Sequence, residues 1–200
     1  MDVIKDIETL ESLYDQAVPA SLSKVAREMT PHYRQWIEAS RFAVLTTVGP
    51  EATDGSPRGD DGPVVRIADE NTLLLPDWRG NNRLDSLRNI VVDGRVSLMF
   101  MVPGCANVVR VNGNAVLSAD ETLTNSFAKN GKAPKTVIVI TIGEMYFQCA
   151  KAIMRSKIWS GIDESDGLPS AGDFIKEFKA GFDGAAYDEG YAEYAKPRMW

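Results

Sequence analysis

The densest group of anion-binding side chains follows a short apolar run at residues 72–75. The group comprises Pro76, Asp77, Trp78, Arg79, Asn81, Asn82 and Arg83, and a helical pattern at residues 82–89 begins where it ends. A helix N-terminus presents free N–H groups and the positive end of its dipole, so it attracts anions. Arg79 and Arg83 flank that end with planar guanidinium groups that match phosphate oxygens. The segment therefore predicts a phosphate site; the alternative is a plain helix cap by Asn82, with the arginines in solvent.

Arginine is the dominant basic residue around this segment. Residues 25–128 contain no lysine but ten arginines. One of them, Arg66, lies in a short strand pattern at residues 64–67 between apolar neighbours. An arginine in that context is either an edge charge or the partner of a buried ion. From there its side chain can also reach the same phosphate as Arg83, which strengthens the phosphate hypothesis.

Composition excludes several other classes of function. The chain has 200 residues, with 28 acidic against 22 basic side chains and a net charge of −6. Residues 161–200 account for −5 of that charge and residues 1–160 for −1. An acidic chain is a poor general nucleic-acid binder. One histidine and two cysteines exclude a histidine-clustered metal centre and a disulfide scaffold. No apolar run is long enough to span a membrane, so we expect a cytoplasmic protein with no membrane partner.

The pattern of elements predicts a single, mainly β domain with flanking helices. Residues 1–40 read as a helical N-terminal extension, residues 41–159 as a barrel, and residues 160–200 as a loop, a short helix near 173–179 and a tail. Six β-rich runs occupy residues 42–48, 64–67, 72–75, 96–102, 107–117 and 136–148. Short strands separated by turn signals favour an antiparallel barrel or sandwich. The absence of G-x-G-x-x-G and P-loop motifs disfavours a Rossmann site.

This order of features resembles the pyridoxamine 5′-phosphate oxidase-like FMN-binding split barrels. A strand with an arginine, a hairpin, an apolar strand, a Gly-x-basic stretch and a helix follow one another, and the likeness covers residues 42–159. The chain is most similar to the branch of uncharacterised proteins that carry a helical N-terminal extension. The resemblance implies a six-stranded antiparallel split barrel that dimerises, with FMN in the groove between the subunits.

The resemblance also assigns residues to the flavin. Arg66 matches the strand arginine that reaches the flavin phosphate, with Val65 and Ile67 lining the ring. Pro76 and Asp77 match the strand end beside the polar edge of the ring. The phosphate cradle corresponds to Asn81, Asn82 and Arg83, next to Trp78 and Arg79. A stretch approaching from the partner subunit corresponds to Gln148, Lys151 and Arg155, with Trp159; its alternative is a strand end followed by a solvated helix.

Two departures from the family pattern bear on the substrate. The glutamine that the true oxidases carry on the fifth strand is replaced here by Val108 or Asn107. Their C-terminal arginine–histidine motif has no counterpart, because the tail contains no histidine. The sequence therefore predicts an FMN-dependent oxidoreductase of an unidentified small molecule, with NAD(P)H as a candidate electron donor, and not a vitamin B6 oxidase. The alternatives are a non-catalytic flavin- or tetrapyrrole-binding carrier or sensor, and a ligand-free dimeric barrel.

The remaining candidates have ordinary structural explanations. No side chain is a compelling acid or base, so the catalytic residues stay unassigned, and Cys149 reads as a core cysteine. The pairs at residues 60–61 and 69–70 read as solvated turns, so we predict no metal site. Residues 137–140 are apolar on both faces of their strand, which favours a homodimer.

Overall fold

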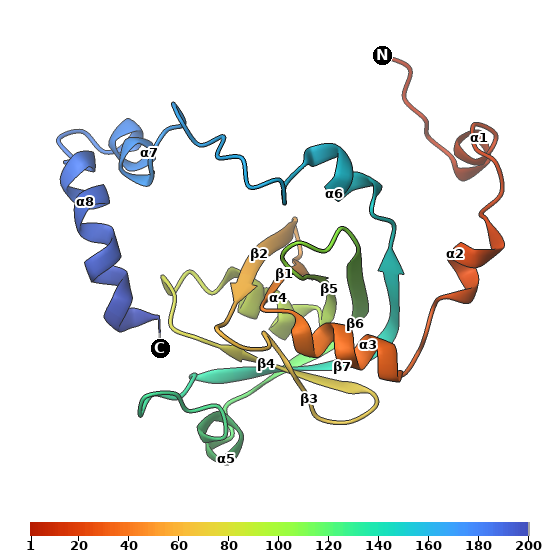
Figure 1. Cartoon of the computed structure of the whole chain (residues 1–200), viewed down its shortest axis with the longest axis horizontal. Coiled ribbons are helices and arrows are strands. Elements are labelled where there is room, and N and C mark those ends of the chain that lie inside the picture. Colours follow the sequence, from red (N-terminus) through yellow and green to blue (C-terminus); the bar gives the residue numbers. More distant parts are fainter. Residues whose placement is uncertain (200) are drawn as a thin grey trace.

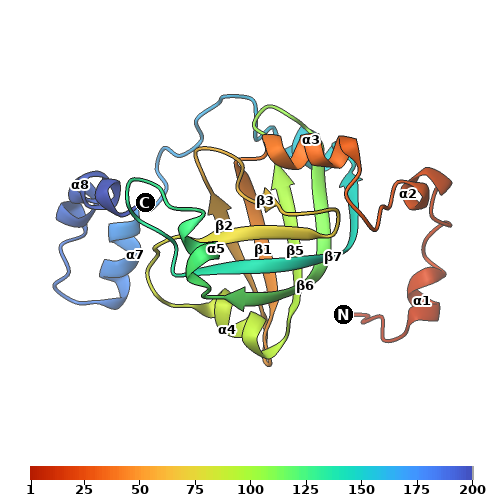
Figure 2. The ribbon, with the colours of Figure 1, turned by 90° about the horizontal axis from the view of Figure 1, so that it is seen from below.

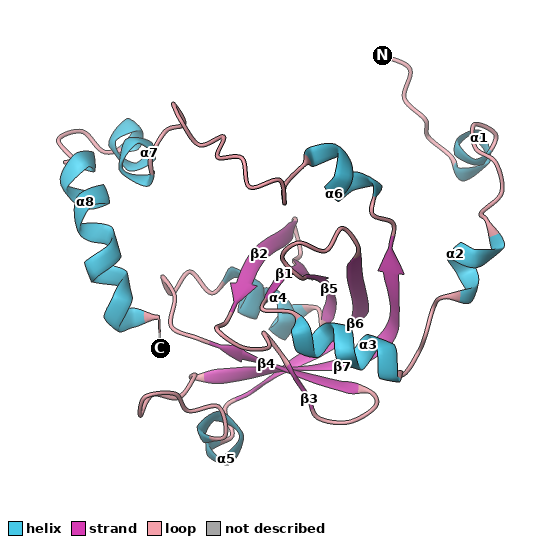
Figure 3. Ribbon diagram, in the orientation of Figure 1, coloured by secondary structure: helices cyan, strands magenta, loops and turns pink. Residues whose placement is uncertain are grey.

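The computed structural model describes residues 1–199, whose centre is one curled antiparallel sheet (Figures 1 and 3). Its strands are β1 (Phe42–Val48), β2 (Thr53–Gly59), β3 (Arg66–Ile67), β4 (Thr72–Asp77), β5 (Arg95–Met101), β6 (Val108–Ser118) and β7 (Thr136–Gln148). In space they follow the order β2-β1-β5-β6-β7-β4-β3. The prediction of a mainly β, antiparallel architecture with flanking helices is confirmed.

Alternating residues of these strands form the core. Along β1, buried positions alternate with half-buried ones, as a strand with one face inward requires. The inward side chains of Leu45, Leu98, Val111, Ile138 and Met145 are fully buried in one apolar cluster. The sheet curls around this cluster, so the middle of its inner face is apolar.

The long β6–β7 hairpin bends at a register shift between Asn112 and Gly113. A Cβ atom on Gly113 would lie 2.1 Å from the carbonyl oxygen of Thr141, so the close approach requires glycine. The bend lets β7 continue past β4, which pairs only with its first half. The second half of β7 is bordered instead by the chain before α3, through a bridge between Ala26 and Met145.

The sheet has seven strands, so the prediction of six was wrong, and the missing one is β2. The segment Thr53–Gly59 reads TDGSPRG, and its glycines, proline and aspartate are turn formers. It is a strand because all seven residues pair with β1. Pro57 is tolerated because β2 is an edge strand, whose other side needs no donor. The sheet is also open, since β2 and β3 form its two unjoined edges.

Four helices lie against or beside the sheet: α3 (Pro31–Ala39), α4 (Asp85–Val92), α5 (Glu121–Asn125) and α6 (Lys151–Ser156). α3 begins with Pro31 in its first turn, where the missing N–H of proline costs no hydrogen bond, and buries Ile37. α4 contacts β1, β2 and β6 and buries Ser86 and Ile90. It starts three residues later than the helical pattern indicated, because Asn82 and Leu84 adopt positive φ angles.

Both ends of the chain extend away from the sheet (Figure 2). The N-terminal end carries α1 (Ile7–Glu11) and α2 (Pro19–Ser23), and the C-terminal end carries α7 (Ala171–Phe178), α8 (Gly184–Ala195) and the short 3-10 helix η1 (Lys196–Arg198). The predicted helix near residues 173–179 is confirmed as α7, but the predicted tail is largely the helix α8. Within residues 1–199, no helix combines the length and the apolar character needed to cross a membrane.

Candidate functional site

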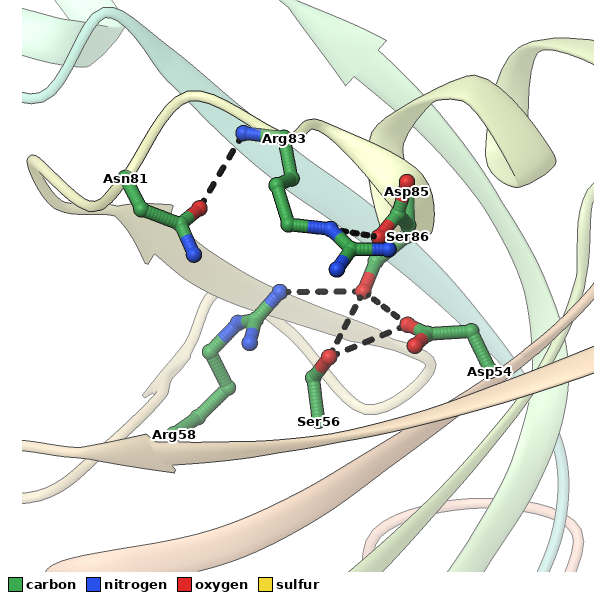
Figure 4. A network of polar contacts seen from close by, with 7 residues as sticks. All are labelled: Asp54, Ser56, Arg58, Asn81, Arg83, Asp85 and Ser86. Carbon is green, nitrogen blue, oxygen red and sulfur yellow. Dashed lines mark hydrogen bonds and ion pairs between the residues drawn. The ribbon is translucent and has the colours of Figure 1, made fainter. Parts of the chain in front are cut away.

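A network of polar side chains joins β2 to the start of α4 (Figure 4). The Ser86 hydroxyl donates to a carboxylate oxygen of Asp54 at 2.5 Å, and Ser56 donates to the same carboxylate at 3.0 Å. Arg58 Nη2 donates to Ser86 Oγ at 3.2 Å. Three residues of one strand thus converge on a single buried hydroxyl of the helix.

The register of β2 explains this convergence. Arg58, Ser56 and Asp54 lie opposite Ala43, Leu45 and Thr47, respectively, all of which are fully buried. Cross-strand partners share a face of the sheet, so the three polar side chains point to its inner side. They occupy the end of the inner face that α4 covers. A pattern of polar residues at every second position was the available sequence signal, but its turn-forming neighbours concealed the strand.

Arg58 is only partly satisfied by this network. Its Nη1 donates to the carbonyl oxygen of Pro57 at 3.0 Å, but its Nε is buried and has no hydrogen-bond partner within residues 1–199. Asp77, at the inner end of β4, is half-buried: burial raises the pKa of this carboxyl, and the nearby charge of Arg58 lowers it. The site therefore combines a cation with donor capacity to spare and a carboxyl that resists ionisation.

The loop before α4 places further donors beside this network (Figure 4). Leu84, the residue before the helix, has φ +63° and makes no side-chain cap, so the N–H groups of the first turn are not capped by it. Asn81 accepts a hydrogen bond from the Arg83 N–H at 3.1 Å instead of capping the helix. Arg83 is exposed and pairs with Asp85 at 2.9 Å. Asn82 therefore does not cap α4, contrary to the alternative interpretation of the sequence, because the helix starts at Asp85.

Arg66 lies elsewhere, on the outer face of the sheet. It is opposite Leu74 in the β3–β4 pair, and Leu74 is paired in turn with Val139. Its guanidinium lies 3.6 Å from the ring centroid of Phe127 and donates to Ser126 Oγ at 2.9 Å. The structure therefore brings Arg83 to the Arg58 network and gives Arg66 separate partners after α5.

Lys129, two residues after Phe127, links the segment after α5 to the end of β2. It forms ion pairs with Asp60, two residues after Arg58, and with Asp61, at 2.5 Å in the second case. The Trp78 indole N–H donates to the other oxygen of Asp60 at 3.1 Å. Hydrogen bonds with Asp60 and Lys129 lower the pKa of Asp61 to about 2. The pair at residues 60–61 is thus a structural ion-pair centre, and residues 1–199 hold no group of three metal-ligating side chains.

Comparison with known proteins bears on what this arrangement is. The family model of pyridoxamine 5′-phosphate oxidase matches residues 29–149, more than half of the chain. This chain belongs to the pyridoxamine 5′-phosphate oxidase family. The resemblance inferred from the sequence is confirmed. No curated protein sequence matches the chain.

Solved structures of the same fold are distant in sequence. A single-residue variant of HupZ from Group A Streptococcus superposes with a TM-score of 0.50 at 17% identity, covering 60% of this chain and 98% of that one. Unsubstituted HupZ gives 0.48 at 17% identity, with 58% and 91% covered. A proposed pyridoxamine 5′-phosphate oxidase of Lactobacillus delbrueckii gives 0.47 at 17%, with 60% and 95% covered. The HupZ variant supports the fold assignment and nothing beyond it.

Several residues that the family pattern assigns to the flavin lie in the core of this family member. Val65 is buried in the central cluster, and Ile67 packs against the cluster from its edge. Pro76 is buried in β4, opposite Val137. Arg79, Asn81 and Asn82 are exposed in the loop before α4. Only the loop residues and Asp77 therefore lie together at the α4 end.

The residues predicted after the last strand lie at the other end of the sheet. The start of β7 pairs with Asp77, whereas Gln148 ends it. At about 3.3 Å per residue, the 13 residues of β7 separate these ends by roughly 40 Å along the strand. Lys151 and Arg155 are exposed on α6, which follows, and the Trp159 indole donates to the Cys105 carbonyl at 2.9 Å. The two groups of predicted flavin contacts therefore lie at opposite ends of β7.

The apolar strand at residues 137–140 is largely covered within one chain. Val137, Ile138 and Ile140 are fully buried, and α5 contacts β7. Val139 is half-buried, so three of these four residues need no partner to cover them. The cysteines Cys105 and Cys149 are free, as expected, but Cys149 is exposed, so the prediction of a core cysteine was wrong: it directly follows the last residue of β7 and precedes α6, outside the sheet's core.

Proposed function

We propose that this family member is an FMN-dependent oxidoreductase that acts on a small molecule, with the flavin held at a homodimer interface. Membership of the pyridoxamine 5′-phosphate oxidase family supports it. The observation that carries the proposal is the Arg58 guanidinium, whose buried Nε has no partner within residues 1–199. It lies beside a helix start that its preceding residue does not cap. Buried donors without acceptors fit an anionic group such as the FMN phosphate.

The residues have distinct roles in this proposal. Arg58 and Arg83 would hold the phosphate from two sides, and the first-turn N–H groups of α4 would donate to it. Asp54 and Ser56 orient Arg58 through Ser86, and they keep the guanidinium on the inner face. Lys129 holds Asp60, which in turn holds Trp78 at the rim of the site. Bound FMN would supply two-electron redox chemistry, for which the protein provides position and electrostatics.

The separation of the two ends of β7 supports a shared site. Gln148 is roughly 40 Å along β7 from the Asp77 end, and Lys151 and Arg155 follow it on α6. In this proposal they reach the flavin from another copy of the chain. We therefore keep these three residues as proposed contacts from the partner subunit of a homodimer.

The substrate of such an enzyme is a molecule other than pyridoxamine 5′-phosphate. Residues 161–200 contain no histidine, so the family's C-terminal arginine–histidine motif has no equivalent here. The same observation favours a second candidate function, a flavin- or tetrapyrrole-binding carrier or sensor without turnover. A cytoplasmic location, with reduced cysteines, fits both candidates.

Absorbance of the purified full-length chain tests the proposal. Bound FMN gives an absorbance band at about 450 nm, and NADPH consumption with candidate acceptors then measures turnover. A colourless chain that takes up no added FMN would contradict flavin binding. A yellow chain that neither consumes NADPH nor oxidises any substrate would support the carrier or sensor.

A further inference from the structure

The N-terminal arm, defined as residues 1–23, leaves its apolar residues in solvent. Neither α1 nor α2 buries a residue. The exposed fraction is 67% for Ile7 and 64% for both Leu13 and Leu22. Ile7 lies on α1, Leu13 in the turn after it and Leu22 on α2, and exposed apolar residues gathered in one segment mark an interaction surface.

The helices α1 and α2 are too short to be stable by themselves. α1 and α2 have five residues each, although isolated helices below about 12 residues are marginal in water. The Asp6 side chain caps α1 through the Thr9 N–H at 2.8 Å, but one cap does not compensate for missing packing. The arm therefore needs a surface that one chain does not provide.

The C-terminal arm, defined in the sequence as residues 161–200, contains a preformed helical hairpin, α7 and α8. Gly172 and Gly184 let α7 and α8 cross closely, since a Cβ on Gly172 would lie 2.2 Å from the Gly184 carbonyl oxygen. The Asp188 carboxylate accepts from the Gly172 N–H at 2.9 Å, and Ser170 and Asp173 form a capping box at the start of α7. These contacts hold the hairpin together, and η1, which follows it, accepts a hydrogen bond from Lys132 Nζ at the Pro197 carbonyl oxygen, at 2.8 Å.

This hairpin presents large aromatic side chains to solvent. On α7, Phe174 is 55% and Phe178 is 88% exposed. Tyr187, Tyr191 and Tyr194 on α8 are exposed as well, and the rings of the first two lie 5.9 Å apart. Aromatic residues on a rigid scaffold are enriched at protein interfaces, because they bury a large area at little entropic cost.

The charges of the chain divide at the same boundaries as the arms. Residues 1–23 hold five acidic and one basic side chain, and residues 161–200 hold nine and four. Residues 24–160, which contain the whole sheet, hold fourteen acidic and seventeen basic side chains. The arms are thus strongly acidic and the body is basic, so the complement of each is present in the same molecule.

We propose that the two arms dock onto the body, residues 24–160, of a second copy of this chain. Each protomer would place acidic, apolar arms on the basic body of its partner, an exchange that a two-fold axis makes reciprocal. The proposal deepens the homodimer proposed above and rests on it. A second copy is the occupant because one sequence carries both complementary halves, whereas α1, α2, α7 and α8 extend away from their own sheet (Figure 2). Where the C-terminal arm meets its own body, Lys132 Nζ donates to the Pro197 carbonyl oxygen at 2.8 Å, a contact that leaves Phe174 and Phe178 exposed.

Sedimentation equilibrium of full-length variants tests the arms directly. Replacing both Phe174 and Phe178 by serine should raise the dimer dissociation constant at least about 100-fold, since four large apolar side chains leave the interface. The matched control, Phe174→Tyr with Phe178→Tyr, keeps both large aromatic rings and should dimerise like the wild type. Raising NaCl from about 50 to about 500 mM should weaken the dimer, because the attraction between arms and body is screened.

Hydrogen exchange of the wild-type chain gives a second measure that does not depend on a variant folding. Backbone amides of α1, α2 and α7 should be protected at concentrations where the dimer forms and exchange rapidly after dilution to the monomer. Fast exchange in a stable dimer, with the double variant dimerising like the wild type, would overturn the docking of the arms. A monomer at all concentrations would overturn it together with the homodimer.

The colour of the same samples separates this proposal from the proposed function. A yellow dimer with unprotected arms would leave FMN binding intact and refute the docking. A colourless dimer with protected arms would refute FMN binding and support the docking of the arms.

Discussion

Two arginines of this protein, Arg58 and Arg66, occur in neighbouring segments but face opposite sides of the sheet. Arg58 is opposite the buried Ala43 and faces inward, toward α4. Arg66 is opposite Leu74 and faces outward, where Phe127 and Ser126 occupy its guanidinium. Period-two alternation along paired strands is enough to produce this division.

The two guanidinium groups differ in whether their donors already have partners. Arg66 has a ring beneath it and a hydroxyl beside it, which is an ordinary way to satisfy a surface arginine. Arg58 has a buried Nε without a partner in residues 1–199, next to a helix start not capped by Leu84. Family likeness singled out Arg66, whereas the geometry favours Arg58 as the stronger ligand-binding cation. Substitutions at the two positions can show which of the two arginines binds the ligand more strongly.

The largest effect is expected at Arg58. Replacing Arg58 by methionine should weaken FMN binding about 100-fold, or roughly 3 kcal/mol, because a charged donor at a partly buried site is lost. Quenching of flavin fluorescence during titration measures the affinity, and circular dichroism checks the fold. Arg58→Lys keeps the charge but loses the planar fork, so it should recover only part of the affinity. Wild-type affinity in the methionine variant would contradict the role of Arg58.

A smaller effect is expected at Arg83. Replacing Arg83 by alanine should weaken FMN binding about tenfold, because this exposed side chain is one of several donors. Arg95→Ala is the matched control: Arg95 also pairs with an aspartate two residues away, Asp93, at 2.6 Å, but lies outside the site. Equal loss of affinity in both variants would reduce the effect of Arg83 to general surface charge.

Arg66 should matter less for the ligand. Replacing Arg66 by alanine should change FMN affinity by no more than about threefold and lower stability by about 0.5–1 kcal/mol, the usual contribution of an exposed cation–π pair. Urea unfolding and the same fluorescence titration measure both quantities. If Arg66→Ala weakens binding more than Arg58→Met does, the family assignment is correct and our ranking of the two arginines is reversed.

The smallest effect concerns Asp77 and pH. Burial raises the pKa of Asp77 in the folded state, and Arg58 partly opposes this. Its contribution to stability is then present below the unfolded-state pKa and is lost as pH rises through the folded-state pKa. Asp77→Asn cannot ionise, so the variant should gain stability relative to the wild type between about pH 4 and pH 7. A difference independent of pH would show that Asp77 titrates normally.

Sequence reasoning predicted the strands that alternate or carry β-branched residues, because their pattern is local. It missed β2, whose residues are turn formers and become a strand only through pairing with β1. The predicted phosphate loop around Arg83 was found beside a polar network, but Asp54, Ser56 and Ser86 were not anticipated. Ser86 is 32 residues from Asp54, and no short-range pattern links them.

By itself, the sequence determined the family, the mainly β architecture, the arginine-rich loop before α4 and the acidic character of the C-terminal end. These depend on composition and on patterns within one segment. The tertiary structure alone decided which face each arginine occupies, since that depends on the register between strands. It also decided that the predicted flavin contacts lie at opposite ends of β7, and that the terminal helices leave their apolar residues uncovered, because both depend on how distant segments pack.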